Sequence, residues 1–210
     1  MYLTRARREP NANTGVEIYT SQRSDASWSA PVKFEITADT ISSYGHPAVS
    51  PDGNWLYFTS DMPGGSGGKD IWRINLRERV GTLENMGEFI NTPGDEMFPF
   101  VRTDSILYFA SDGHPGYGGL DIFKATLSKS GGWKVENMGK PVNSSADDFG
   151  ITFGNGERGF FSSNRTDGRG YDHIYSFELP DLQIWISGWV LDKDEEPVPN
   201  AVIRIVGNDG

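Results

Sequence analysis

Ser50–Asp61 reads SPDGNWLYFTSD and joins a turn signal, an aromatic run and a second turn signal. Asp, Gly and Asn favour a tight turn, and the aromatic and β-branched residues after it favour a β-strand. The surrounding segment, Trp55–Leu76, matches Ile106–Leu127 and, less closely, Arg158–Leu179 in the order of its parts. The chain is therefore built from an internal repeat.

The repeat has a nearly constant period. An aromatic residue recurs at intervals of 51 and 52 residues and an aspartate at intervals of 51, in the sets Tyr57, Tyr108, Phe160 and Asp70, Asp121, Asp172. Each unit predicts four short strands: one before the turn, the aromatic one, one that starts at the repeated aspartate and one after it. Tandem units of four antiparallel strands are typical of β-propeller blades. A solenoid would need a shorter coil or a helical period.

We therefore predict an all-β fold in which residues 1–180 form β-propeller repeats. A partial blade covers 1–40, and units follow at about 41–90, 91–143 and 144–180, the last without an evident fourth strand. Because propellers close with at least four blades, either upstream residues complete the ring or a short ring shares strands across the termini. We favour a fragment of a longer chain. Residues 181–210 predict two strands at the start of a second, truncated β-sandwich domain.

Charge and composition exclude several classes of partner. The formal net charge is −10, which opposes binding to nucleic acid and to anionic lipid surfaces. The chain has no cysteine, so disulfides and thiolate chemistry are excluded. No stretch approaches the roughly 18 apolar residues of a membrane span, and no signal-peptide apolar region follows Met1. Either the chain is not exported, or it is a piece of a longer precursor.

The motifs of the second unit carry a family resemblance. Residues 46–61, HPAVSPDGNWLYFTSD, together with GGKDIWRI at 67–74, resemble the WD-type repeat of TolB-like propellers. The later units depart from the Ser-Pro-Asp-Gly turn. Residues 186–205, ISGWVLDKDEEPVPNAVIRI, are similar to the opening of carboxypeptidase-regulatory-like domains. This order of parts resembles the middle of OmpA-family envelope proteins of Bacteroidetes, including the PorE-like components of type IX secretion and gliding.

The resemblance implies a role and a location. It implies a non-catalytic propeller scaffold that mediates protein–protein interaction in the cell envelope, in the periplasm and associated with the outer membrane. In the family, a C-terminal OmpA-like domain binds peptidoglycan. That domain is not in this sequence, so peptidoglycan binding is implied only for a parent chain. The step from fold to role is an analogy, because one fold hosts many activities.

Acidic residues gather in the predicted loops. The loops between strands two and three and between strands four and one emerge on the same face of a propeller. The candidates on this face are Asp39, Asp61, Asp95, Glu96, Asp112, Asp147 and Asp148. Such a face could attract a basic partner or hold Ca²⁺ on its carboxylates, although no segment has the spacing of an EF-hand. The repeated Asp70, Asp121 and Asp172 are interpreted as structural, because a residue that recurs once per blade is more often architectural.

Three other patterns are weaker. GGSGG at 64–68 satisfies the Gly-x-Ser-x-Gly pattern around Ser66, but it lies between two strands rather than in a strand-to-helix turn. We interpret its glycines as turn residues that adopt positive φ. The histidines occupy different repeat positions and cannot form a symmetric metal site; they are His46, His114 and His173. Loop aromatics could stack on a sugar, although packing is the preferred interpretation; they are Tyr44, Phe98, Tyr117 and Phe149.

Two other function classes stay open at this point. The chain could be an enzyme or the accessory propeller of a hydrolase, and glycan hydrolysis would need paired carboxylates such as Asp95 with Glu96 or Asp147 with Asp148. Adjacent residues on a strand point to opposite faces, which disfavours these pairs. A cation- or glycan-dependent adhesin is the third class. We expect no catalytic activity and no obligatory cofactor.

Overall fold

The computed structural model describes residues 1–7, 15–78, 82–165, 171–180 and 187–204. Over these ranges the chain forms strands, bends and turns and no helix, which confirms the predicted all-β class. No helix in the described part is long and apolar enough to span a membrane. The chain divides into two units, Met1–Leu179 and Pro180–Gly210, which we describe separately.

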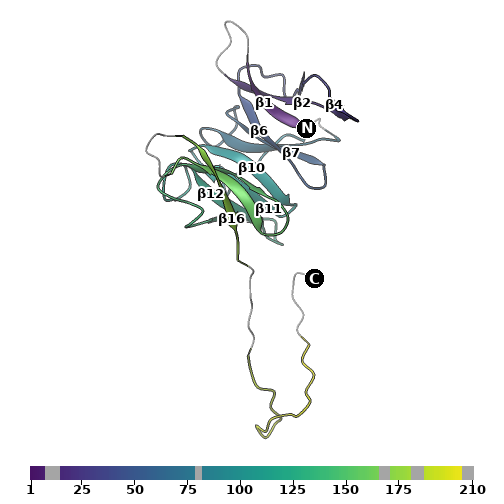
Figure 1. Cartoon of the computed structure of the whole chain (residues 1–210), viewed down its shortest axis with the longest axis vertical. Helices are drawn as coiled ribbons and strands as arrows, with labels where there is room; N and C mark the ends of the chain where they lie inside the picture. Colours follow the sequence, from purple (N-terminus) through teal and green to yellow (C-terminus); the bar gives the residue numbers. More distant parts are fainter. Residues whose placement is uncertain (8–14, 79–81, 166–170, 181–186, 205–210) are drawn as a thin grey trace. The chain divides into compact units, whose positions relative to one another are not determined.

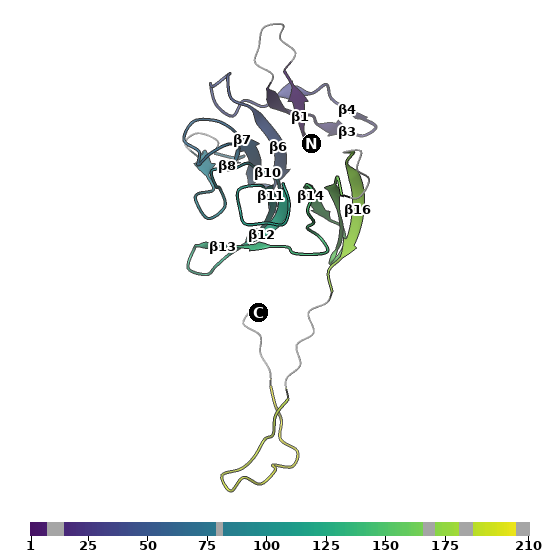
Figure 2. The same ribbon diagram turned by 90° about the vertical axis from the view of Figure 1, so that its left-hand side faces the viewer.

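The first unit contains four antiparallel sheets and one small hairpin (Figures 1 and 2). The first sheet has the order β1 (Tyr2–Ala6), β2 (Val16–Thr20) and β5 (Val32–Lys33), and the hairpin is β3 (Arg23–Ser24) with β4 (Ser27–Trp28). The second has the order β6 (Tyr44–Val49), β7 (Trp55–Ser60), β8 (Asp70–Asn75) and β9 (Glu84–Asn85). The third has the order β10 (Glu96–Thr103), β11 (Ile106–Ser111), β12 (Asp121–Leu127) and β13 (Trp133–Asn137). The fourth has the order β14 (Asp148–Phe153), β15 (Arg158–Ser163) and β16 (His173–Glu178).

The strand register corrects one predicted equivalence. Asp70 pairs with Ser60 and Asp121 with Ser111, but the partner of Ser163 is His173. His173 therefore occupies the position of the repeated aspartate, and Asp172 lies one residue before β16 and is exposed. The prediction for Asp172 was wrong because the last unit is one residue longer before this point, as the 52-residue interval from Tyr108 to Phe160 indicates.

The core lies between neighbouring sheets. Tyr57 and Ile71 of the second sheet pack in one cluster with Leu107, Phe109 and Phe123 of the third. Two further clusters join the first sheet to the second and the third to the fourth. Fully burying an aromatic or aliphatic side chain of this size contributes about 1.5–3 kcal/mol. Sheet-to-sheet packing is therefore the main source of stability.

Two buried asparagines brace the third strand of their units, and the sequence analysis missed them. Asn91 accepts a hydrogen bond from the Ile71 N–H at 2.8 Å and donates to the Ile71 carbonyl at 3.0 Å. Asn143, 52 residues later, makes the same pair of bonds with Ile122 at 2.8 Å each. The two carbonyls also accept the N–H groups of Met86 and Met138, so what each amide supplies alone is the acceptor for the N–H of Ile71 or Ile122.

The glycine-rich loops are needed for close approach. A Cβ on Gly67 would lie 2.3 Å from the backbone of Pro93, and one on Gly118 would lie 2.3 Å from the carbonyl oxygen of Ala146. Neither residue has a positive φ, whereas Gly64 does, with φ of 97°. The predicted positive φ thus applies to Gly64, and the loops require glycine at positions 67 and 118 because the next loop packs directly on their backbone.

In the second unit the structure describes Pro180 and residues 187–204. One isolated antiparallel bridge joins Leu191 to Pro197 around a turn in which Asp192 accepts N–H groups of Asp194 and Glu196. The two predicted strands do not form over these residues, and the rest of the prediction falls on 181–186 and 205–210, outside the described residues. Trp189 is 86% exposed. A hairpin without a second layer to cover its apolar side is only marginally stable, and the β-sandwich stays a prediction.

The bracing amide predicts a large stability effect. Asn91→Ala leaves the buried Ile71 N–H without a partner, whereas the Ile71 carbonyl keeps the bond from the Met86 N–H, so the free energy of unfolding should fall by about 2 kcal/mol. Urea unfolding followed by tryptophan fluorescence measures this. Asn155→Ala, at an exposed turn position, is the matched control and should change the value by less than about 0.5 kcal/mol. Equal effects of the two substitutions would contradict the bracing role.

Close approach predicts a contrast between two glycines. Gly118→Ala forces a methyl group against the Ala146 carbonyl and should lower the free energy of unfolding by about 2 kcal/mol. In Gly132→Ala the new methyl group meets only the Ser128 hydroxyl, at 3.9 Å. This substitution should leave the free energy of unfolding unchanged or raise it slightly. Thermal unfolding of both variants tests this, and a neutral Gly118→Ala would refute it.

Candidate binding groove on the inner strands

The first strands of the second, third and fourth sheets share one irregularity. The register shifts between Gly45 and Ala48 in β6, between Met97 and Phe100 in β10, and between Phe149 and Thr152 in β14. Inside these three bulges lie His46, Phe98 and Gly150, with φ of 48°, 54° and 64°. They recur at intervals of 52 residues. The left-handed backbone is thus a repeated feature of the inner strands.

Glycine adopts this conformation without cost, but His46 and Phe98 do not. A left-handed backbone costs a residue with a Cβ roughly 1–2 kcal/mol. Proline follows both residues, at Pro47 and Pro99, and fixes the next φ. Strained residues of this kind cluster at functional sites when the surrounding structure holds them in place. What distinguishes His46 and Phe98 from Gly150 is their rings.

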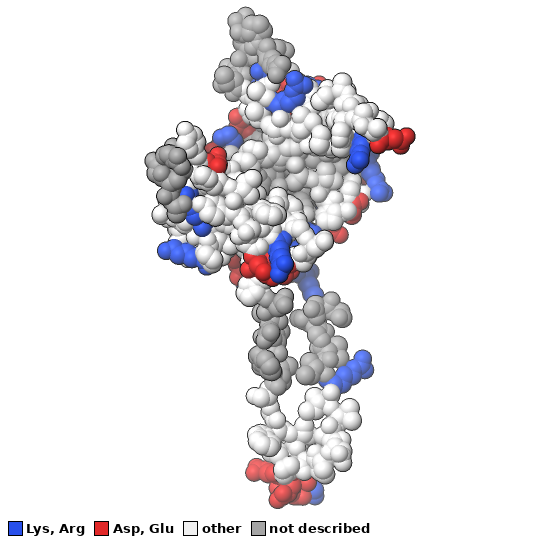
Figure 3. Space-filling model, in the orientation of Figure 1, with Lys and Arg blue, Asp and Glu red and all other residues white. Residues whose placement is uncertain are grey.

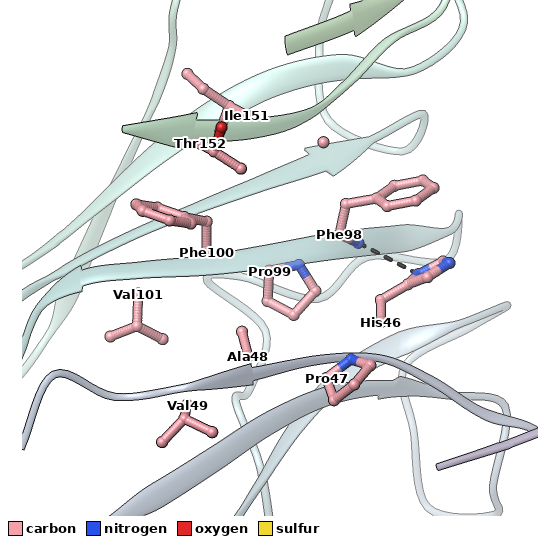
Figure 4. Close-up of a pocket in the computed structure, with 11 residues that line it drawn as sticks. His46, Pro47, Ala48, Val49, Phe98, Pro99, Phe100, Val101, Ile151 and Thr152 are labelled. Carbon is pink, nitrogen blue, oxygen red and sulfur yellow. Dashed lines mark hydrogen bonds between the residues drawn. The ribbon is translucent and has the colours of Figure 1, made fainter. Parts of the chain in front are cut away.

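The rings form a stack across three sheets. The centroids of His46 and Phe98 lie 3.9 Å apart with 17° between their planes, and those of Phe98 and Phe149 lie 4.9 Å apart. The Phe98 N–H donates to Nδ1 of His46 at 3.4 Å (Figure 4). The His46 N–H donates in turn to Thr4 Oγ1 at 3.0 Å. The bulges therefore place the rings of three units in contact.

The stack borders two cavities, which together we call the inner groove. The first has a volume of about 330 Å³ and its walls come from β6, β10 and β14, including His46, Pro47, Val49, Phe98, Pro99, Phe100 and Ile151 (Figure 4). No charged side chain lines it. The second, of about 370 Å³, shares His46 and Phe98 and adds Val16, Thr59, Lys69 and Met97. In the view of Figure 3 the middle of the first unit is hollowed and uncharged, and charges lie around its margin.

The environment of His46 keeps its ring neutral. Burial, with a smaller contribution from the positive charge of Lys69, lowers the pKa of His46 from 6.5 to about 4. A neutral ring can accept the hydrogen bond from Phe98 at Nδ1, whereas an imidazolium cannot. From the sequence, His46 is considered only as a ligand of a symmetric metal site, which its repeat position excludes. Its alignment with Phe98 at the position before a proline was the available signal.

One hydroxyl group beside the inner groove lacks a hydrogen-bond partner. The Thr59 side chain is 3% exposed, and its hydroxyl has no hydrogen-bond partner among the residues that the structure describes. Thr59 lines the second cavity. An unpaired buried hydroxyl is costly, so this position suits a ligand that supplies the missing partner.

The predicted acidic face is occupied by hydrogen bonds between loops. Asp61, Asp112 and Asn164 each accept a backbone N–H from the residue before the inner strand, and these donors are Ser43, Asp95 and Asp147. Asp95 accepts the Lys69 N–H at 2.8 Å and pairs with its ammonium group at 2.9 Å. Asp147 accepts the Leu120 N–H at 3.0 Å. Asp61 and Asp112 therefore hold the entry of their own sheet, and Asp95 and Asp147 join the loop of one sheet to the entry of the next.

The other predicted acids are also engaged. Glu96 is fully buried and accepts bonds from Thr92 and Ser111, and burial raises the pKa of its carboxyl. Asp148, also fully buried, accepts from Ser144 and pairs with Arg165. Within each predicted pair, Asp95 with Glu96 and Asp147 with Asp148, the two carboxylates therefore serve different loops.

Asp39 caps the turn before β6. Its carboxylate accepts the Ile41 and Ser42 N–H groups and the Tyr44 hydroxyl. Hydrogen bonds from Ser42 and Ile41 lower the pKa of Asp39 to about 2. Asp39 therefore also belongs to the loop structure rather than to a free acidic surface.

The repeated aspartates hold the glycine-rich loops. Asp70 accepts the Ser66 N–H and the Asn85 amide, and Asp121 accepts the N–H groups of Tyr117 and Gly118. Ser66 is thus a loop residue whose backbone is bound by Asp70. Among the described residues, no three His, Asp or Glu side chains converge in a way that would hold a metal ion.

The predicted aromatic platform is divided by the structure. Phe98 and Phe149 lie together in the stack with His46. Tyr44 is 7% exposed and packs in the core between the first and second sheets. Tyr117 is half exposed in its loop, with the Lys140 ammonium 5.5 Å from its ring. The four rings therefore do not form one surface.

Comparison with known proteins shows the fold. No protein-family model matches the sequence, and no curated protein matches it. The structure is similar to TolB from Acinetobacter baumannii, with a TM-score of 0.50 and 15% identity over 78% of this chain and 35% of that chain. Prolyl oligopeptidase B from Galerina marginata is similar with a TM-score of 0.49 and 15% identity, over 84% of this chain and 24% of that chain. The chain therefore contains blades of a TolB-like β-propeller and spans about a third of the TolB chain.

The His46 ring predicts a pH-dependent stability. Its pKa is 6.5 when unfolded and about 4 when folded, so the unfolded chain binds more protons between these values. The contribution of the neutral His46 ring to the free energy of unfolding is complete above pH 6.5. About 3 kcal/mol of this free energy is lost as the pH falls to 4. His46→Asn, which tolerates the left-handed backbone, should flatten this part of the urea-unfolding profile. A slope unchanged by His46→Asn would contradict the assignment.

Proposed function

We propose that the chain is a non-catalytic propeller scaffold of a bacterial cell-envelope protein, and that its inner groove holds a segment of a protein partner. The TolB-like fold supports the scaffold. The resemblance of the repeats and of residues 186–205 supports an OmpA-family assembly of the type IX secretion or gliding type, in the periplasm at the outer membrane. Peptidoglycan would be bound only through an OmpA-like domain that is not in this sequence.

The observation that carries the proposal is the strained ring stack. His46 and Phe98 keep a left-handed backbone, and the stack that results borders both cavities. Cavities of about 300–1,000 Å³ with mostly apolar walls and a few polar groups are typical ligand sites. The Thr59 hydroxyl and the Lys69 side chain supply polar groups beside the stack. An extended peptide with an apolar or aromatic side chain fits this chemistry.

The use of the carboxylates supports a scaffold rather than an enzyme. Asp61, Asp95, Asp112 and Asp147 accept backbone N–H groups of neighbouring loops. A carboxylate that holds a loop N–H is a poor general base, because proton uptake weakens that bond. The same bonds compete with Ca²⁺ for the oxygens. We therefore favour a peptide partner over the glycan- or cation-binding adhesin and over the hydrolase accessory.

Site-specific crosslinking tests the proposal. A photoreactive amino acid replaces Val49, which lines the groove and is 38% exposed, or Val32, which lies off the groove and is 64% exposed. After irradiation in a Bacteroidetes envelope extract, position 49 should yield a discrete protein adduct and position 32 should not. Phe98→Gly, which relaxes the backbone but removes the central ring, should abolish the adduct.

Three outcomes would contradict the proposal. Equal adducts at positions 49 and 32 would mean that the groove is not selective. An adduct that survives Phe98→Gly would mean that the stack does not bind the partner. Calorimetric binding of Ca²⁺, or a thermal shift with muropeptides or glycans and no protein adduct, would favour the adhesin.

A further inference from the structure

The four sheets repeat one pair of side chains on the face that leads to the next sheet. One member of the pair is an isoleucine on the third strand of the unit, and the other is an aromatic residue on the second strand. The isoleucine lies opposite a small residue that follows the aromatic residue by two positions. The strand pairings place Ile18 opposite Thr4, Ile71 opposite Thr59, Ile122 opposite Ala110 and Ile174 opposite Ser162. The aromatic members are Tyr2, Tyr57, Tyr108 and Phe160. We call the isoleucine and the aromatic residue together the forward face of a sheet.

The next sheet covers the first three forward faces. Ile18 is 1% exposed, and Ile71 and Ile122 are fully buried. Each lies in a cluster with residues of the following sheet. The forward face of the fourth sheet has the same composition but different exposure, since Phe160 is 55% and Ile174 78% exposed. A face that is buried three times in this fold is therefore open to solvent once.

Each covering sheet presents a matching pair, which we call its receiving face. In three sheets this pair consists of two aromatic residues directly opposite each other, Phe58 with Trp72, Phe109 with Phe123 and Phe161 with Tyr175. The first sheet has Leu3 opposite Tyr19 in the same register. Neither belongs to the core cluster that holds Tyr2 and Ile18, because successive strand residues point to opposite faces. Leu3 and Tyr19 are half-buried, so in the described part of the chain one receiving face is uncovered by a sheet and one forward face is exposed.

The charges beside the two open faces do not oppose their association. Arg158 and Glu178 pair at 2.9 Å on the side of Phe160, since alternate strand residues share a face. On the receiving face the Arg5 guanidinium lies 4.9 Å from the Tyr19 ring, and Lys33 pairs with Glu17 at 2.8 Å. Both faces have ion pairs of mixed sign around an apolar centre. Like-charge repulsion between them is therefore small.

We infer that the forward face of the fourth sheet binds the receiving face of the first sheet in a second copy of this chain. The contact is head-to-tail, so two different surfaces meet and each chain can use both. Phe160 and Ile174 of one copy pack on Leu3 and Tyr19 of the other as Tyr57 and Ile71 pack on Phe109 and Phe123 within the chain. On the fourth sheet Phe149 lies opposite Ser162 and Thr152 lies opposite Phe160, so the contact borders the inner groove.

Sedimentation velocity over a concentration series tests the contact. It is done at about 0.15 M salt, where the Debye length is about 8 Å and the net charge of −10 is screened. The wild-type chain should self-associate, and Ile174→Asp and Phe160→Asp should each weaken this at least tenfold. Ile41→Asp is the matched control, because Ile41 is 73% exposed and lies on neither face. Circular dichroism melting establishes that the variants are folded.

Mixing two variants tests the head-to-tail geometry. Ile174→Asp leaves the receiving face intact, and Leu3→Asp leaves the forward face intact. Each variant alone should be monomeric, and the 1:1 mixture should form a heterodimer that does not grow further. A wild-type chain that stays monomeric, an Ile41→Asp effect equal to that of Ile174→Asp, or a mixture that stays monomeric although both variants are folded would overturn the inference.

Discussion

The structure depends on one contact that recurs between sheets: a tyrosine and an isoleucine of one sheet pack on two aromatic residues of the next. A three- or four-stranded sheet of short strands cannot bury both of its faces by itself. Stacking solves this, because each sheet covers the face of its neighbour. The same constraint explains why the fold tolerates changes in turn sequence from unit to unit but keeps the aromatic and isoleucine positions.

The polar residues serve this stacking. The loops at one end of the sheets run close together, so their backbone N–H groups need acceptors that water cannot supply. Aspartate and asparagine side chains take this role at equivalent positions, as Asp61 and Asp112 do for the inner strands and Asn91 and Asn143 for the third strands. These acidic loop residues therefore serve the geometry of the backbone, and this changes where a binding site should be sought.

The site that we propose lies instead on the inner strands, each of which carries one of the three bulges. A bulge rotates a side chain out of the strand plane, and its repetition in β6, β10 and β14 brings His46, Phe98 and Phe149 into one stack. Two of the three bulges keep a ring in a conformation that favours glycine. The ring stack and the open forward face meet on the fourth sheet, because Phe149 of the stack lies opposite Ser162, the partner of Ile174.

The sequence by itself determined the repeat, the four-stranded units and the all-β class, because strand alternation and turn residues act locally and recur at a readable interval. It also placed the aromatic strand correctly in every unit, since Tyr57, Tyr108 and Phe160 are equivalent in the register. The extra residue that displaces Asp172 can be read from the 52-residue interval between Tyr108 and Phe160. Only the tertiary structure decided that the acids hold loops and that His46 stacks on Phe98, 52 residues away. These facts depend on the distance between sheets and on the direction of backbone N–H groups, which packing sets. The order of residues in the sequence contains neither the distance nor the direction.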